Sequence, residues 1–287
     1  MSIRTFYKMS GSGNDFVFFD TRDWGIDDAP PDRFDRNDAS VFYTIPGIQA
    51  LCARGTGVGA DGVVFVERAD GADVGIRYVN SDGSPAALCG NATLCTVRLA
   101  AELRIGGPGS LRIATDSGVV SARLVNGVPE FDLGTVERLT AAPPIARAAG
   151  ESRLGYAVTG VPHIVVVVDG VDRIPLASRG AALRSDPWTG AAGANVNFVA
   201  PHPTSAGEWI MRTYERGVEG ETLACGTGAV AVAALLTAWD LARTTPVRLW
   251  TRSGAPLDVT VTRRGESWHA ALRGEGRLLF RGELVDL

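Results

Sequence analysis

The sequence predicts an α+β protein built from two related halves. Short apolar runs separated by turns, many of them at the 35 glycines, indicate many short strands. Only two segments have a clear helical pattern, and each directly follows a Cys-Gly pair. The order strand, turn, Cys-Gly and helix occurs twice, which predicts two domains of similar fold.

The two copies of this repeat cover residues 77–103 and 212–238, and their cysteines are separated by 136 positions. Helices are expected at residues 91–103 and 227–243, where alanine and leucine are frequent. The domain boundary is expected within residues 118–126. A lag of about half the chain is typical of two related domains rather than of a short structural repeat.

The repeat gives each half one cysteine. We expect an N-terminal domain of residues 1–122 that carries Cys89 and a C-terminal domain of residues 123–275 that carries Cys225. The last strand, residues 276–287, is expected to return to the first domain. In each copy a strand is expected to end in a polar residue nine positions before the cysteine, at Asn80 and at Arg216.

Charge and hydropathy limit the classes of partner. The chain has 28 Lys+Arg and 32 Asp+Glu residues, a net charge of −4, and no basic run of the kind that binds nucleic acid. It shows no signal-peptide pattern and no apolar run near the roughly 20 residues that span a bilayer. We therefore expect a cytoplasmic protein with a small-molecule substrate, no nucleic-acid partner and no membrane association.

Four cysteines, Cys52, Cys89, Cys95 and Cys225, are too few for a disulfide framework in 287 residues. They are expected to be thiols that serve packing, metal binding or chemistry. A zinc site is disfavoured because the chain has no CxxC pair and only three histidines, so we expect no metal. A redox pair of Cys89 and Cys225 stays open, although no CxxC supports it.

A cysteine at the start of a helix is suited to proton transfer. Unpaired amides and the helix dipole stabilise a thiolate there, and they can lower a thiol pKa from about 8.5 toward neutrality. Gly90 and Gly226 would let a carboxylate approach the backbone amides closely. If the domains close face to face, Cys89 and Cys225 would flank one ligand and could invert an α-carbon without a cofactor.

Six motifs in this order resemble those of the diaminopimelate epimerase family. They are GSGNDF (11–16), GVGADG (57–62), NSDGSPAALCGN (80–91), GVPH (160–163), NVNF (195–198) and YERGVEGETLACGTGA (214–229). The resemblance implies two pseudo-symmetric domains, each a strongly curved antiparallel sheet or open barrel around a central helix, with the active site in the interdomain cleft. It implies interconversion of LL- and meso-2,6-diaminopimelate in lysine and peptidoglycan precursor synthesis, without pyridoxal phosphate, metal or other cofactor.

The resemblance also assigns residues. Cys89 and Cys225 match the catalytic pair, and His163 and Glu215 match positions that tune the thiols. The positions matched to substrate binding are Asn14, Asn80, Gly90, Asn91, Asn195, Glu215, Arg216, Gly226 and Thr227. The guanidinium of Arg216 is suited to a bidentate grip on the distal carboxylate. Without the motifs, the three asparagines Asn14, Asn80 and Asn195 would equally suit turns or caps.

Three departures from the family pattern bear on the substrate. Val161 stands where the family often has asparagine, which removes an amide expected at the distal end of the ligand. The first helix reads CGNATLC and lacks a usual arginine, and residues 21–46 form a longer connection with adjacent prolines. These changes leave the thiol pair in place but leave the exact substrate open.

Three other functions fit parts of the sequence. A racemase of another amino acid would use the same thiols, and Val161 is the main argument for it. An acyl-transfer enzyme would need one cysteine and His163 as a nucleophilic dyad. A two-lobed amino-acid-binding protein would use the helix termini without needing the thiols. Exposed strands would permit a homodimer in each case.

Overall fold

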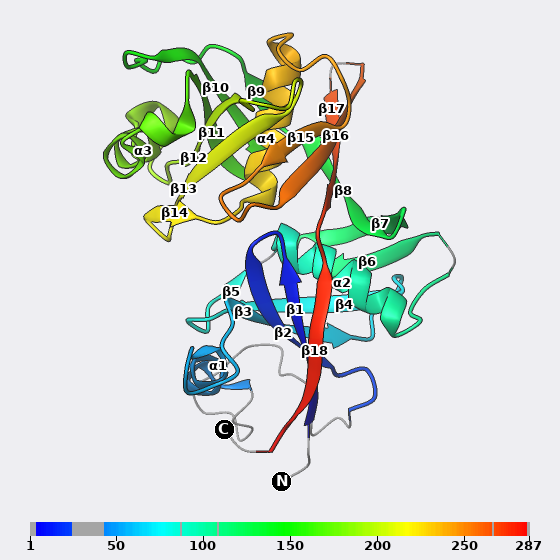
Figure 1. Ribbon diagram of the computed structural model, residues 1–287. Helices are drawn as coiled ribbons and strands as arrows, with labels where there is room; N and C mark the ends of the chain where they lie inside the picture. Colours follow the sequence, from blue (N-terminus) through cyan, green and yellow to red (C-terminus); the bar gives the residue numbers. More distant parts are fainter. Residues whose placement is uncertain (1–3, 25–42, 87, 108, 266, 286–287) are drawn as a thin grey trace. The chain divides into compact units, whose positions relative to one another are not determined.

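The computed structural model describes residues 4–24, 43–86, 88–107, 109–265 and 267–285 (Figure 1). Most of the long connection expected at residues 21–46 therefore lies outside the described residues. The chain divides into two compact units: Met1–Phe131 with Glu275–Leu287 forms the first unit, and Asp132–Gly274 forms the second unit. The domain boundary near residue 122 stays a prediction.

The two units contain similar sets of elements. The first unit holds β1 (Arg4–Gly11), β2 (Asn14–Asp20), α1 (Ile45–Cys52), β3 (Gly62–Glu67), β4 (Val74–Asn80), β5 (Pro85–Ala86), α2 (Gly90–Glu102), β6 (Leu111–Thr115), β7 (Gly118–Val125), the start of β8 (Val128–Val136) and β18 (Arg277–Leu284). The second unit holds β9 (Arg138–Thr140), β10 (Glu151–Thr159), β11 (Val161–Val168), η3 (Val171–Arg173), α3 (Leu176–Arg184), η4 (Pro187–Thr189), β12 (Asn195–Pro201), β13 (Trp209–Glu215), β14 (Gly220–Thr222), α4 (Gly226–Ala238), β15 (Val247–Trp250), β16 (Pro256–Arg264) and β17 (Ser267–Gly274).

Strand pairing follows one scheme in both units. The first unit has the neighbours β18, β1, β2, β3, β4, β6, β7 and β8, in that order. The second unit repeats this scheme with β9, β10, β11, β12, β13, β15, β16 and β17. The sheets are strand-rich and mixed, so the expectation of a curved antiparallel sheet or open barrel in each half is corrected in one respect, the presence of parallel pairs.

Four parallel pairs account for this difference: β2 with β3, β4 with β6, β11 with β12, and β13 with β15. Each pair is joined by a connection that contains a helix, α1, α2, α3 or α4 respectively. Two parallel strands need such a long crossover, because a tight hairpin turn reverses the chain direction. The helices that follow the cysteines are therefore crossovers between neighbouring parallel strands.

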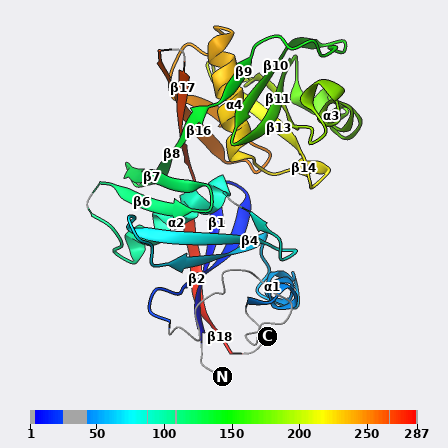
Figure 2. The ribbon, with the colours of Figure 1, turned by 180° about the vertical axis from the view of Figure 1, so that it is seen from behind.

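Helix α4 is the core of the second unit. It packs against β10, β11, β12, β16 and β17, and Figures 1 and 2 show it lying along the strands of its own sheet. Its residues 228–236 are all buried, as expected for a helix that is apolar on every side. In the first unit α2 packs against β1, β7 and β18. No helix in the described ranges is long and apolar enough to span a bilayer.

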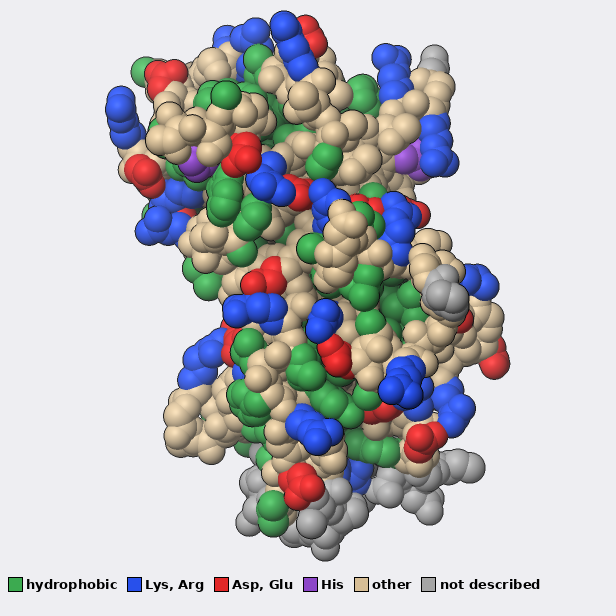
Figure 3. Space-filling view, turned by 45° about the vertical axis from the view of Figure 1, so that its right-hand side comes forward, with side chains coloured by type: hydrophobic (Ala, Val, Ile, Leu, Met, Phe, Trp, Pro, Cys, Tyr) green, Lys and Arg blue, Asp and Glu red, His purple; other side chains and the backbone are tan. Residues whose placement is uncertain are grey.

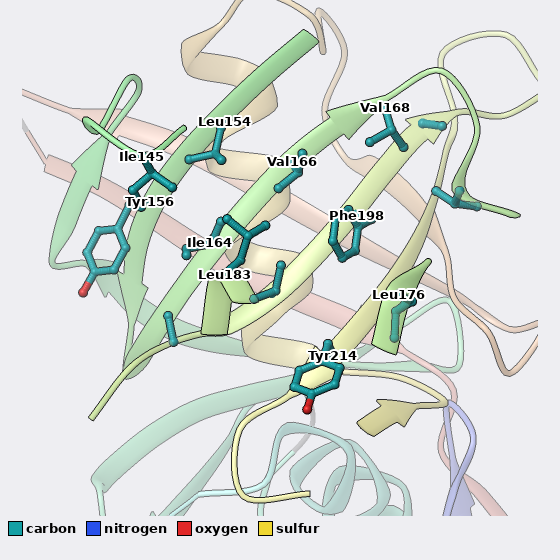
Figure 4. Close-up of a cluster of buried hydrophobic side chains, with 14 residues drawn as sticks. Ile145, Leu154, Tyr156, Ile164, Val166, Val168, Leu176, Leu183, Phe198 and Tyr214 are labelled. Atoms are coloured by element: carbon teal, nitrogen blue, oxygen red, sulfur yellow. The ribbon is translucent and has the colours of Figure 1, made fainter. Parts of the chain in front are cut away.

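The opposite face of the second sheet is covered by α3. Ile164, Val166 and Val168 of β11 belong to one buried cluster with Leu183 of α3 (Figure 4). Because side chains alternate along a strand, His163 of the same strand points to the α4 side. The β11–β12 ladder pairs His163 with Asn195, which brings the polar side chains of both strands to the start of α4.

Two element ends differ from the sequence expectation. The helix expected at residues 227–243 ends at Ala238, because Asp240 has a φ of +57° in the left-handed region and the chain turns away. Strand β13 ends at Glu215, one residue before Arg216. Glu215 and Asn80, which ends β4, therefore occupy corresponding strand ends.

The surface carries both signs of charge. On the face shown in Figure 3, Lys and Arg side chains are interspersed with Asp and Glu side chains. This agrees with the near balance of 28 basic and 32 acidic residues. Some of these charges are paired between neighbouring strands, as Arg248 of β15 is with Asp258 of β16 at 2.7 Å.

The buried cluster that includes Leu183 of α3 predicts which shortened side chains destabilise the second unit. Leu183 is 1% exposed, so Leu183→Ala should lower the free energy of unfolding by about 2–5 kcal/mol through lost burial and a cavity. Leu241, in the same unit, is 39% exposed, and Leu241→Ala is the matched control, with an expected loss of about 1 kcal/mol or less. Equal losses in urea denaturation would contradict this packing.

Candidate active site

Each Cys-Gly pair begins a buried helix in the same geometry. Cys89 caps α2 with φ −123° and ψ 113°, and Cys225 caps α4 with φ −136° and ψ 108°. The carbonyl of Cys89 accepts from Thr93 N, and that of Cys225 accepts from Ala229 N, both at 2.9 Å. Neither cysteine side chain caps its helix. Each cysteine therefore stands at the positive, N-terminal end of its helix, where the first-turn amides have no partner within the helix.

The first helix start is held by a chain of amides and a carboxylate. Asn91 Nδ2 donates to Asn14 Oδ1 at 2.7 Å, and Asn14 Nδ2 donates to Asp61 Oδ2 at 3.0 Å. Asn91 is 3% exposed, and within the described ranges its Oδ1 has no hydrogen-bond partner. The structure thus brings Asn14 and Asn91 together beside Cys89.

Asp61 was not singled out from the sequence, although it lies inside the GVGADG motif. It accepts from the backbone N of Asp15 at 3.1 Å and from Arg54 at 2.8 Å, while Asp15 accepts from both Lys8 and Arg54. Burial would raise the pKa of Asp15, but the hydrogen bonds from Arg54 and Lys8 outweigh it and lower that pKa. This ionic cluster fixes Asp61 and, through it, the amide of Asn14.

The second helix start is held by neutral groups instead. His163 Nε2 lies 3.0 Å from Thr227 Oγ1, which lies 3.6 Å from Cys225 Sγ. On its other side, His163 Nδ1 lies 3.2 Å from Asn197 Nδ2. Burial, with a smaller effect of Arg216, lowers the pKa of His163 to about 3. The ring is therefore neutral at physiological pH and connects to Cys225 through a hydroxyl.

Glu215 is the last residue of β13, and Arg216 follows it. Burial raises the pKa of Glu215, so its carboxyl keeps its proton to a higher pH than an exposed glutamate does. Asn195 Oδ1 accepts from the backbone N of Arg216 at 2.8 Å, which fixes the turn that carries this arginine. The Nη1 atom of the Arg216 guanidinium lies 3.5 Å from the carbonyl oxygen of Ala192. Asn195 therefore positions Arg216 through its backbone.

Asn80 makes the contacts of a turn residue. Its backbone N donates to the Ser84 carbonyl at 2.8 Å, and its Nδ2 lies 3.0 Å from Ser84 Oγ. Both bonds close the turn before β5. This is the turn role that Asn80 would equally suit without its motif. In the described part of the chain, no group of three or more His, Cys, Asp or Glu side chains could hold a metal ion.

Comparison with known proteins gives the family. The model of the family described as "Diaminopimelate epimerase" matches residues 6–139 and 155–278. The chain belongs to this family. It is 44% identical to the diaminopimelate epimerase of Gemmatimonas aurantiaca over 99% of this chain and 100% of that protein. It is 37% identical to that of Aquifex aeolicus over 98% of each chain. The resemblance expected from the six motifs is confirmed.

Solved structures extend the fold beyond this family. A phenazine biosynthesis protein of the PhzF family from Bacillus anthracis matches with a TM-score of 0.74 at 14% identity, over 100% of both chains. A hydroxyproline epimerase from Agrobacterium vitis matches with a TM-score of 0.63 at 17% identity, over 98% of this chain and 92% of that one. These likenesses show a shared fold. The family within that fold comes from the family match.

The ionic cluster around Asp15 predicts a component of acid stability. Its lowered pKa means that its contribution is complete above the unfolded-state pKa near 4 and is lost as pH falls through the folded-state value. The free energy of unfolding, measured from about pH 5 downward, should therefore fall less steeply with pH in Asp15→Asn than in the wild type. Asp23→Asn is the control, because its side chain is 84% exposed. An unchanged slope in Asp15→Asn would contradict the assignment.

Proposed function

We propose that this protein interconverts LL- and meso-2,6-diaminopimelate by proton exchange at one α-carbon, with Cys89 and Cys225 as the two acid/base groups. Diaminopimelate is the substrate that the family implies, and the resemblance implies a role in lysine and peptidoglycan precursor synthesis. The observation that supports the two-thiol mechanism most strongly is the repeated helix start. Both units place a cysteine at the same backbone position before a buried helix.

The chemistry needs two groups of opposite protonation state. One cysteine, as thiolate, removes the α-proton from one face, and the other, as thiol, donates its proton to the opposite face. The protein ends with the two protonation states exchanged, so the reverse reaction can follow without a cofactor. Charge that develops on the substrate carboxylate would be stabilised by first-turn amides at Gly90–Asn91 and Gly226–Thr227. The buried Asn91 Oδ1 would suit a donor such as the α-ammonium group.

The distal end of the ligand is assigned to Arg216. Its backbone is fixed by Asn195, and its planar guanidinium can bind a second carboxylate through two parallel hydrogen bonds. A monocarboxylic amino acid would leave this group without its partner. Val161, which begins β11, offers no side-chain amide there, so Arg216 carries more of the distal recognition.

Isotope exchange tests the two-thiol mechanism. LL-diaminopimelate incubated with the reduced protein in deuterated water should give meso product that carries deuterium at the inverted carbon. Cys89→Ala and Cys225→Ala should each lower epimerisation by at least about 100-fold, because each removes a group that moves the proton. Cys52→Ala removes a buried thiol at the end of α1 and is the matched control, with activity near that of the wild type.

The other functions predict different results. Exchange only with another amino acid would identify a different racemase, and a covalent thioester would identify acyl transfer. Binding without exchange in any variant would identify a binding protein. Retention of epimerisation in either single cysteine variant would overturn the two-thiol mechanism.

Arg216 gives a separate prediction about specificity. Loss of charge-assisted hydrogen bonds in Arg216→Ala should raise KM for diaminopimelate by about 10–100-fold. Arg263→Ala, at an exposed position on β16, is the control and should leave KM unchanged. An unchanged KM in Arg216→Ala would show that another group binds the distal carboxylate.

A further inference from the structure

In the second unit a row of hydrogen bonds leads from a strand hydroxyl to a proposed catalytic thiol through Thr213, Asn197, His163, Thr227 and Cys225. We propose that Asn197 is a positioning residue that holds the His163 ring with its proton on Nε2. The Thr227 hydroxyl then donates its own hydrogen to the Cys225 thiolate. This inference rests on the proposed function for the role of Cys225 as a thiolate.

The contacts of Asn197 determine which way its amide points. Its Nδ2 lies 3.1 Å from the carbonyl oxygen of Ile164, and its Oδ1 accepts from Thr213 Oγ1 at 2.9 Å. A carbonyl oxygen only accepts, so the group that faces Ile164 is the NH2 group. The same NH2 group lies 3.2 Å from His163 Nδ1. That ring nitrogen must therefore present its lone pair, which places the single proton of the neutral ring on Nε2.

The direction of the remaining bonds follows. His163 Nε2–H donates to Thr227 Oγ1 across 3.0 Å. Thr227 Oγ1 lies 3.6 Å from Cys225 Sγ, within hydrogen-bond distance for sulfur. A thiolate has no hydrogen, so the Thr227 hydroxyl must be the donor of that bond. Because each group polarises the next, the whole row stabilises negative charge on Cys225.

Burial gives the row its fixed protonation. The side chains of His163 and Asn197 are both fully buried, and burial lowers the pKa of His163 to about 3. The charged group that acts on His163 is Arg216, whose effect has the same sign. An imidazole with this pKa does not store the proton of Cys225 near pH 7. His163 therefore acts here as a hydrogen-bond donor rather than as a base.

The packing of α4 keeps Asn197 and Cys225 close. A Cβ on Gly228 would lie 2.4 Å from Asn197 Oδ1 and 3.2 Å from Cys225 Sγ, so only glycine lets the helix start this near to β12. Thr159 Oγ1 donates to the Thr227 carbonyl at 2.9 Å and fixes the first turn of α4 to β10. The row is thus built into the packing of the unit.

The first unit provides an internal comparison. The β2–β3 ladder pairs Phe16 with Gly62 as the β11–β12 ladder pairs His163 with Asn195. By the same registers, the positions that correspond to His163, Asn197 and Thr213 hold Phe16, Val64 and Tyr78. The first unit therefore lacks the imidazole and the amide at these positions, and the row serves Cys225 alone.

The tautomer can be measured without any change at the row itself. In a His202→Gln, His269→Gln variant, His163 is the only histidine of the chain. Nitrogen-15 NMR should show a neutral ring with its proton on Nε2, and no titration between about pH 5 and 8. A proton on Nδ1, or an imidazolium in this range, would overturn the proposal.

Asn197→Asp tests the function of the tautomer. A carboxylate at this position can only accept, so it would draw the ring proton to Nδ1 and turn Nε2 into an acceptor for the Thr227 hydrogen. Cys225 would lose its donor, and its alkylation by iodoacetamide near pH 7 should slow about tenfold. Peptide-resolved mass spectrometry follows both thiols, and Cys89 in the same molecule is the control, with an unchanged rate.

Thr227→Val separates this effect from the charge of the new carboxylate. It removes the hydroxyl without adding charge and should slow alkylation of Cys225 to a similar degree, whereas Thr227→Ser should restore it. The proposal is overturned if neither Asn197→Asp nor Thr227→Val slows alkylation, or if Cys89 slows equally. If Asn197→Asp does not fold, the NMR measurement of the His163 tautomer and the alkylation rates of Thr227→Val and Thr227→Ser test the proposal. None of these measurements uses substrate, so failure of the epimerase proposal would be seen separately, in the exchange experiment.

Discussion

The position of each proposed catalytic thiol depends on a helix that is buried against its own sheet and begins at the next residue. The second helix fits because its face is lined with small residues, and because Gly228 leaves room for a strand amide. Its first turn is tied to β10 through Thr159. The sulfur of Cys225 is therefore placed by core packing, and a change in that packing would move it.

The two units share a topology, but different kinds of interaction fix their helix starts. In the first unit, Asn91 reaches Asn14, which is oriented by Asp61 within an ionic cluster. In the second unit, the Thr227 hydroxyl lies within hydrogen-bond distance of His163, whose ring is neutral and fully buried. The backbone symmetry suits a reaction in which two thiols exchange roles. The unequal surroundings give each thiol its own hydrogen-bonding environment.

Much of this protein could be predicted from local sequence. The Cys-Gly helix starts, their lag of 136 residues and the six motifs predicted the repeated helix starts and the family. The mixed sheets were missed, because strand direction depends on how a crossover packs rather than on the strand's own pattern. The early end of α4 was missed because residues up to 243 keep helical propensity, whereas Asp240 takes a left-handed conformation.

The sequence by itself determined the family and the residues that are proposed to carry the chemistry, since a thiol at a helix start is a local feature that a motif records. Only the tertiary structure decided which polar side chains meet. Asp61 reaches Asn14 across 47 positions, and Asn197 reaches His163 across 34. These contacts depend on the register of neighbouring strands, where a shift of one residue would turn each side chain to the opposite face. That register is fixed only when neighbouring strands pair and one face of the sheet is buried.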